Sequence, residues 1–217
     1  MSRVLVTGGM SGIGRATCEL LRAEGVEAFS GDIAPGADVE LDVTSEQSWS
    51  DAIDRLGDFD GLVNCAGIRT SFPIVEMARL EIERLLAINL VGPMIGTGAA
   101  ARAWRAAGHG GSIVNVGSLN ARVSPFPNQS HYAASKGGLL AFSGQTRVEG
   151  DALPFVDYWV DRRGDRRRPN STANHPNAAR RGQSWRRVRG RCGLGVVMRL
   201  VCHSRSIGHT WIRSSMR

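Results

Sequence analysis

The sequence predicts an α/β fold in which helices cover both faces of a doubly wound parallel sheet. Short apolar segments alternate with helical segments over the first 150 residues. These apolar segments are typical of strands that are buried on both faces of a parallel sheet. A glycine-rich turn joins the first of them to the first helical segment. A length of 217 residues suits one domain of ordinary size, or one domain followed by a tail.

The elements follow in order along the chain, and no internal repeat interrupts them. The expected strands are the short apolar runs at residues 3–7, 27–30, 39–43, 61–64 and 112–116. The expected helices lie between and after them, at residues 15–24, 45–56, 73–107 and 131–142. Thr44 or Ser45 is a suitable N-cap for the second helix, since its side-chain oxygen can accept a hydrogen bond from a backbone N–H of the first turn.

The composition divides the chain into two parts, which we expect to be a dinucleotide-binding domain over residues 1–145 and an atypical arginine-rich tail over residues 146–217. Residues 151–217 hold 15 arginines, no lysine, four aspartates and no glutamate, whereas residues 1–150 hold 12 basic and 16 acidic residues. The net charge of +7 therefore belongs to the tail. A nucleic-acid-binding function is not expected of the first part.

Cysteine usage and hydropathy favour a cytoplasmic protein. The four cysteines form no CxxC pair and no spacing typical of a metal site, so we expect free thiols and no metal. The first residues lack the pattern of a secretory signal peptide. No uninterrupted apolar run is long enough to span a bilayer, which needs about 18 residues or more.

The glycine-rich turn runs from Thr7 to Gly14 with the sequence TGGMSGIG. It lies between a strand and a helix, where glycines let backbone N–H groups approach a pyrophosphate at the positive end of the helix. Asp32 follows the second strand, and a carboxylate there can accept hydrogen bonds from the adenosine ribose hydroxyls. The same carboxylate would repel a 2′-phosphate, so NAD is favoured over NADP. Taken alone, the turn could be a simple turn and Asp32 a solvated loop acid.

Two further motifs lie where this fold would place its ligand. The segment Asn64-Cys-Ala-Gly67 follows the fourth strand, where small residues leave room for a ligand in the crevice at the carboxyl ends of the strands. Tyr132 and Lys136 lie four residues apart, which puts them on one face of a helix. Lys136 is the only lysine of the chain. An ammonium beside a phenol stabilises the phenolate, which makes Tyr132 a usable general base. Taken alone, such a pair is more often a simple surface contact.

Together, these motifs resemble the short-chain dehydrogenase/reductase family over about residues 3–143, and the resemblance implies a Rossmann-type fold. It implies a catalytic tetrad of Asn89, Ser118, Tyr132 and Lys136. It implies a cofactor site that comprises the turn residues, the ribose-binding acid, a pair beside the adenine and a wall beside the second ribose. These are Gly8, Ser11, Gly12, Ile13, Gly14, Asp32, Asp42, Val43, Asn64, Ala66 and Gly67, with Tyr132 and Lys136 shared by both sites.

The implied reaction is the NAD(P)-dependent interconversion of a secondary alcohol and a ketone. In this mechanism Tyr132 removes the hydroxyl proton while hydride passes to the nicotinamide, and Ser118 hydrogen-bonds the same oxygen. Lys136 holds the nicotinamide ribose, and Asn89 positions a water molecule that relays protons. The substrate is expected to be a small alcohol or ketone, partly apolar because Val123 and Phe126 lie in the loop on the substrate side.

The sequence departs from the family pattern at Cys65, where asparagine is more usual, and throughout the tail. Family members continue with a strand that ends in Pro-Gly, substrate-loop helices and a last strand, and none of these is recognisable here. We therefore expect the C-terminal strands and helices to be missing or scrambled. The tail could be the product of a shifted reading frame, a solvated disordered segment, or a segment that binds nucleic acid through its arginines and tryptophans.

Without the last strands, the family's usual homo-oligomer is in doubt, and no membrane contact is expected. Two functions remain open: an active alcohol/ketone oxidoreductase, and an inactive truncated relative that retains only nucleotide binding. A tail that binds nucleic acid would be independent of both. Turnover of a simple secondary alcohol separates the first two.

Overall fold

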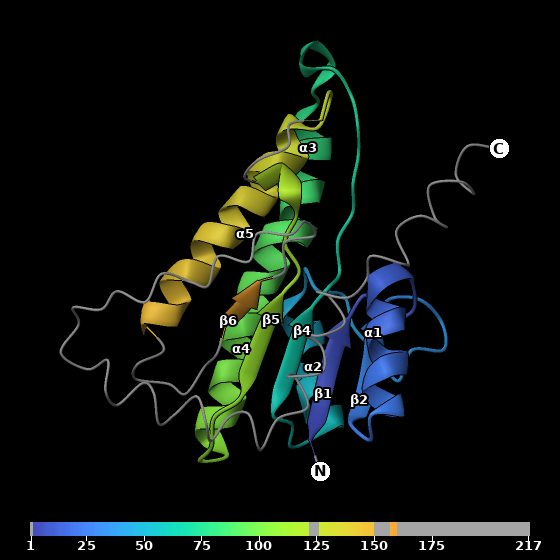
Figure 1. Cartoon of the computed structure of the whole chain (residues 1–217), viewed down its shortest axis with the longest axis vertical. Coiled ribbons are helices and arrows are strands. Elements are labelled where there is room, and N and C mark those ends of the chain that lie inside the picture. The colour runs from blue at the N-terminus through green and yellow to red at the C-terminus, as the bar shows by residue number, and fades with distance from the viewer. Residues whose placement is uncertain (1, 122–125, 150–156, 160–217) are drawn as a thin grey trace.

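A computed structural model describes residues 2–121, 126–149 and 157–159 of the chain. These residues build a parallel sheet with the strand order β3-β2-β1-β4-β5-β6 (Figure 1). The strands are β1 Arg3–Thr7, β2 Glu27–Asp32, β3 Val39–Glu40, β4 Gly61–Asn64, β5 Ser112–Asn115 and β6 Asp157–Trp159. The chain reverses direction across the sheet between β3 and β4, which lie on opposite sides of β1. The predicted doubly wound parallel sheet is confirmed.

The helices occupy both faces of this sheet. They are α1 Gly12–Ala23, α2 Glu46–Leu56, α3 Arg79–Leu86, α4 Gly92–Ala106 and α5 Ser130–Glu149, with the shorter turns η1 Ile74–Glu76, η2 Ala87–Val91 and η3 Leu119–Ala121. The apolar side chains of α1 pack with Val4, Val6 and Val63 on one face. Those of α2 and α4 pack with Leu5 and Leu62 on the other (Figure 1). Alternate residues of one strand thus serve two cores, which is the period-two geometry of a β-strand.

The larger core is built around two tryptophans. Trp49 of α2 and Trp104 of α4 are each about 2% exposed or less, and their indole nitrogens donate to the carbonyl oxygens of Val43 and Phe59 at 3.0 and 2.6 Å. Each ring lies where a glycine leaves space. A Cβ on Gly96 would lie 2.4 Å from Trp49, and a Cβ on Gly111 would lie 2.3 Å from Trp104. The two indoles therefore fill the space that these glycines leave open.

The predicted helix over residues 73–107 is divided in the structure. A 3-10 turn precedes α3, and the π-helical turn η2 separates α3 from α4. The segment Arg79–Ala106 is long and apolar enough, by length and composition, to cross a membrane. Its inner side carries Ala99, Ala100 and Trp104, which are buried against the sheet, and this packing is that of a core helix.

Other boundaries differ by a few residues. Ser45 caps α2 as predicted, because its side chain accepts a hydrogen bond from the backbone N–H of Ser48. Helix α5 continues to Glu149, beyond the expected end at residue 142. The largest difference is β6, a short strand that pairs with β5 although no strand was recognisable after α5. Three residues are too few to show the alternating apolar pattern of a strand in the sequence. The strand is therefore recognised only from its parallel pairing with β5. The division of the chain at residue 145 stays a prediction.

Candidate functional site

The glycine-rich turn lies at the carboxyl end of β1 and leads directly into α1. Ser11 is the N-cap of α1, and its side chain makes no capping hydrogen bond. Gly14 lies in the first turn of α1 against the turn itself, so that a Cβ there would lie 2.1 Å from the carbonyl oxygen of Gly8. No side chain fits this space. The turn is therefore closed by a backbone contact, and the first N–H groups of α1 are left for an anionic ligand.

Hydrogen bonds join the ends of neighbouring strands at this edge of the sheet. The Thr7 hydroxyl accepts from the backbone N–H groups of Cys65 and Ala66, both at 3.0 Å. Behind them, the Asn64 amide donates to Asn115 at 2.8 Å. The Asn115 amide then donates to the hydroxyl of Ser143 on α5, also at 2.8 Å. This buried chain of hydrogen bonds fixes α5 relative to β4 and β5, and so fixes the side chains that α5 carries.

Asn89 braces the loop that follows β4. It is fully buried in η2, its side-chain oxygen accepts from the N–H of Ile68 at 2.8 Å, and its amide donates to the carbonyl of Ile68 at 2.8 Å and to the Ser135 hydroxyl at 3.2 Å. A π-helical turn is frequent at functional sites. Because its amide is engaged with the loop, Asn89 positions Ile68 and its neighbours. The predicted role of Asn89 in holding a water molecule stays a prediction.

Tyr132 and Lys136 lie one helical turn apart on α5 and both line one pocket. The Lys136 ammonium is buried and donates to the carbonyl of Val116 at 2.9 Å. Burial lowers the pKa of Lys136 below its ordinary value, because the charged form loses hydration. Burial raises the pKa of the nearby Cys65 thiol to about 12 although Lys136 opposes this shift. Cys65 is therefore a neutral thiol at physiological pH, and it adds no negative charge beside Lys136.

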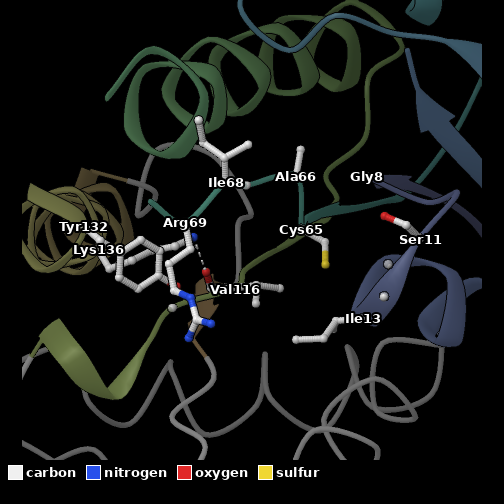
Figure 2. Close-up of a pocket in the computed structure, with 14 residues that line it drawn as sticks. Gly8, Ser11, Ile13, Cys65, Ala66, Ile68, Arg69, Val116, Tyr132 and Lys136 are labelled. Atoms are coloured by element: carbon white, nitrogen blue, oxygen red, sulfur yellow. Dashed lines mark hydrogen bonds between the residues drawn. The ribbon is translucent and has the colours of Figure 1, made fainter. Parts of the chain in front are cut away.

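Figure 2 shows that this pocket extends from the glycine-rich turn to α5. Its lining brings together most of the predicted cofactor residues and half of the predicted tetrad, namely Gly8, Ser11, Gly12, Ile13, Gly14, Ala66, Gly67, Tyr132 and Lys136. The motifs are far apart in the sequence and meet because parallel strands all end at the same edge. Neither aspartate nor glutamate occurs among the lining residues that the structure describes. Two cationic side chains and the amino end of α1 make the pocket attractive to an anionic ligand.

Three further predicted cofactor residues lie outside the described lining of the pocket. Asp32 ends β2 and accepts from the N–H of Met10, in the glycine-rich turn, at 3.1 Å. Asp42 accepts from the N–H and the hydroxyl of Thr44, at 2.9 and 2.7 Å. Val43 is buried in the larger core. The functional roles assigned to these residues stay predictions.

Ser118 lies in the loop after β5, two residues beyond the carbonyl that binds Lys136. Its hydroxyl accepts from the N–H of Asn120 at 3.4 Å, and its carbonyl accepts from the N–H of Ala121 at 3.1 Å. Because η3, which follows Ser118, packs against α5, Ser118 and Tyr132 are carried by adjacent segments. The contact of Ser118 with a substrate oxygen stays a prediction.

Five pocket residues were not among the predicted site residues. Ile68 and Arg69 extend the loop after β4, Val116 and Gly117 follow β5, and Cys65 lies between predicted residues. Two signals could have found them. The first is that every residue directly after a parallel strand lies at the ligand edge. The second is that the loop after β4 continues past its glycine with a charged side chain.

The loop after β4 is also tied to the start of α5. The imidazole of His131, which is buried next to Tyr132, hydrogen-bonds the Thr70 hydroxyl at 2.8 Å and stacks on Phe72 with ring centroids 4.1 Å apart. These contacts hold His131, and with it the start of α5, against the loop. Of the two apolar residues expected on the substrate side, Phe126 is exposed, and Val123 lies outside the described residues.

The fold and the site together define a dinucleotide-binding α/β protein with a tyrosine/lysine pair at the far end of its cofactor pocket. Within the described ranges, no three His, Cys, Asp or Glu side chains are grouped as metal ligands. The family model for short chain dehydrogenases matches residues 2–152. The chain belongs to the short-chain dehydrogenase family, and the resemblance inferred from the motifs is confirmed.

Several characterised proteins share this similarity. The chain is 34% identical over 172 residues to cyclopentanol dehydrogenase from Comamonas sp., covering 70% of this chain and 67% of that protein. It is 34% identical over 176 residues to L-2,3-butanediol dehydrogenase from Corynebacterium glutamicum, with the same two coverages. A short chain dehydrogenase structure from Mycobacterium smegmatis superposes with a TM-score of 0.67 at 29% identity, covering 75% of this chain and 78% of that one. The chain thus spans about two thirds of the length of these two sequence relatives.

Proposed function

We propose that this protein uses NAD to interconvert a small secondary alcohol and the corresponding ketone. The observation that carries the proposal is the pocket that joins the glycine-rich turn to Tyr132 and Lys136. One end suits a dinucleotide, and the other end holds a general base beside an ammonium. Membership in a family of alcohol dehydrogenases supports the reaction type.

The residues present fit a nicotinamide dinucleotide. The amino end of α1 is free of a side-chain cap, and Gly14 keeps the turn close enough to α1 for its N–H groups to reach a diphosphate. Ile13, Ile68 and Val116 supply apolar walls suited to a flat ring. When bound, the nicotinamide would supply the hydride acceptor for oxidation and the hydride donor for reduction.

The protein's own part of the chemistry is proton transfer and orientation. Tyr132 removes the proton from the substrate hydroxyl in oxidation and returns it to the carbonyl oxygen in reduction. The Lys136 ammonium, held by the Val116 carbonyl, stabilises the phenolate that forms. Ser118 hydrogen-bonds the substrate oxygen and orients it toward Tyr132. The loop at Ile68, which Asn89 braces through two hydrogen bonds, forms the wall of the pocket beside these groups.

The preference for NAD rests on Asp32. Its two oxygens accept from the N–H groups of Met10 and Ala34, at 3.1 and 3.0 Å, so the carboxylate is fixed beside the glycine-rich turn. A 2′-phosphate near it would be repelled by about 1 kcal/mol in water, and by about 4 kcal/mol at an effective dielectric constant of ~20, per pair of unit charges at ~4 Å. Asp32→Asn keeps an acceptor and removes the charge. The kcat/KM ratio of NAD to NADP should then fall at least about fivefold; an unchanged ratio would argue against this role.

The test of the reaction uses the full chain, both cofactors, and cyclopentanol and 2,3-butanediol as first substrates, because two relatives are named for them. We expect NAD-dependent turnover by the unmodified protein. In Tyr132→Phe, turnover should fall by a factor of about 10²–10⁴, which is the usual share of general base catalysis. NADH affinity should change little. Retained turnover would refute the assignment of Tyr132.

The alternative function is nucleotide binding without catalysis. This alternative is favoured by the arginine-rich composition of the residues that follow α5, because the match to the family model ends at residue 152. NADH binding without turnover of any secondary alcohol would support this alternative.

Two described cysteines, Cys18 and Cys65, are free thiols, which supports our proposal of a cytoplasmic location. A cell fractionation experiment tests that location directly.

A further inference from the structure

Arg69 has a place in the pocket that neither the reaction nor the cofactor site explains. It follows Ile68 in the loop after β4, and its side chain lines the same pocket as Tyr132 and Lys136. Figure 2 shows its guanidinium between the ring of Tyr132 and the side chain of Ile13. The residue is exposed, and within the described ranges its guanidinium has neither a hydrogen bond nor an ion pair.

The other cation of the pocket is engaged. The Lys136 ammonium is buried and donates to the Val116 carbonyl at 2.9 Å. Elsewhere in the fold, several arginines have carboxylate partners, such as Arg22 with Asp38 at 2.6 Å and Arg79 with Glu83 at 2.6 Å. Arg69 is thus a guanidinium whose five N–H donors are unused by the part of the chain that the structure describes, at the reactive end of the pocket.

Among the described residues, the pocket offers Arg69 no counter-charge, because none of those that line it is an aspartate or a glutamate. A guanidinium presents a planar fork that matches a carboxylate or a phosphate in two parallel hydrogen bonds. The chemistry that completes this arrangement is therefore an oxyanion brought in by a ligand. A cationic substrate would be repelled from the same place.

Two oxyanions could meet Arg69: a carboxylate of the substrate, or the diphosphate of the cofactor. The diphosphate already has a site at the amino end of α1, beside Ser11 and Gly12. The guanidinium lies instead between Tyr132 and Ile13, on the Tyr132 side of the view, whereas Ser11 is labelled on the other side (Figure 2). We infer that Arg69 binds the carboxylate of the substrate, and that the preferred substrates are hydroxy acids and keto acids. This inference rests on the proposed alcohol/ketone reaction.

The expected effect follows from the strength of a charge-assisted hydrogen bond. Such bonds contribute about 1.5–3 kcal/mol, which corresponds to a factor of about 10 to 150 in an equilibrium constant. Because the guanidinium is exposed, a value near the lower end is expected. An acid should therefore bind about tenfold more tightly than a neutral molecule of the same shape.

The experiment compares two acids, 3-hydroxybutanoate and 4-hydroxycyclohexanecarboxylate, with their neutral carboxamides. Binding of each to the full chain saturated with NADH is measured by calorimetry, because an alcohol and NADH form a complex that does not react. The variants are Arg69→Gln, Arg69→Lys and the control Arg105→Gln. Arg105 lies in the last turn of α4, which leads into the start of β5 and so is far from the pocket edge. Arg105→Gln thus removes one positive charge, as Arg69→Gln does, but at a position away from the pocket.

We expect at least one acid to bind about tenfold more tightly than its carboxamide. Arg69→Gln should abolish this preference, Arg69→Lys should retain part of it, and Arg105→Gln should leave it unchanged. Equal binding of acid and carboxamide by the unmodified protein would overturn the inference. So would an Arg69→Gln variant that loses NADH affinity but keeps the preference for acids, since Arg69 would then contact the diphosphate.

Turnover is measured separately with NAD and the same four compounds. Binding of an acid through Arg69 without turnover would contradict the proposed reaction and leave the carboxylate site standing. Turnover of the carboxamides as fast as the acids, with equal affinities, would contradict the carboxylate site and leave the proposed reaction standing. The two failures are therefore distinguishable.

Discussion

Replacing Gly14 by alanine should damage the nucleotide site and destabilise the fold, although the residue lies in a helix. The added methyl carbon would lie 2.1 Å from the carbonyl oxygen of Gly8 and 2.7 Å from its carbonyl carbon. Both atoms belong to the backbone of the turn, so no side chain can move aside. Overpacking of this kind costs about 1–3 kcal/mol, and the steepness of this contact places it near the upper value.

The gain in helix propensity from glycine to alanine offsets about 1 kcal/mol of that cost. We therefore expect Gly14→Ala to lower the free energy of unfolding by about 2 kcal/mol, as the difference of these two effects. NADH affinity should fall as well, because the turn moves away from α1. The matched control is Gly137→Ala in α5, where a Cβ would meet no atom of the described residues within 4 Å. This variant should gain up to about 1 kcal/mol.

Urea denaturation gives both free energies of unfolding, and NADH fluorescence titration gives both affinities. The expected signs are opposite, since one variant is less stable than the unmodified protein and the other is more stable. Equal stability of the two variants would refute the steric argument. A destabilised Gly14→Ala with unchanged NADH affinity would refute the link between the turn and the nucleotide.

Three further predictions concern a surface pair, a buried network and a buried ammonium. The hydrogen bonds to Gly110 and Asp58 raise the pKa of His109. The pairing of His109 with Asp58 should therefore stabilise the fold below the ordinary pKa of 6.5, and this stabilisation should be lost as the pH rises through the raised value. A double-mutant cycle at pH 5.5 should give a coupling free energy of less than about 1 kcal/mol, which disappears at pH 8.5. Asn115→Ala leaves the Asn64 amide without its acceptor in a dry interior, and urea denaturation should report a loss of about 2–4 kcal/mol. Burial lowers the pKa of Lys136, so the unfolded chain binds the proton more tightly than the folded protein, and the free energy of unfolding should rise with pH between the lowered value and 10.5. Lys136→Met should remove this rise. Identical stability–pH profiles of the variant and the unmodified protein would contradict the prediction.

The sequence was sufficient for the sheet and for the two ends of the pocket. Each strand that carries the site is a short apolar run, and each motif directly follows such a strand or lies on a long helix. Tyr132 and Lys136 could be joined to the glycine-rich turn because parallel strands end at one edge. Those relations depend on local pattern and topology alone.

The support of the site could not be predicted in the same way. The contacts of Asn89 with Ile68 and of Asn115 with Ser143 join residues that are far apart in the chain, and nothing in the spacing of these residues specifies them. The π-helical turn at Asn89 leaves no mark in the apolar pattern, which reads as one helix. The strand β6 is too short to show a period. Each of these features arises from tertiary packing.

The two tryptophan–glycine contacts of the larger core limit how this protein can vary. Trp49 occupies the space above Gly96, and Trp104 occupies the space above Gly111, so a side chain at either glycine collides with an indole. A smaller residue at position 49 or 104 would in turn leave a cavity, which costs about 3–5 kcal/mol for tryptophan to alanine. Replacing either member of a pair while the other is unchanged therefore lowers the stability of the fold. Positions 49 and 96, and positions 104 and 111, should therefore covary among homologues, with a small residue at one wherever an indole occupies the other.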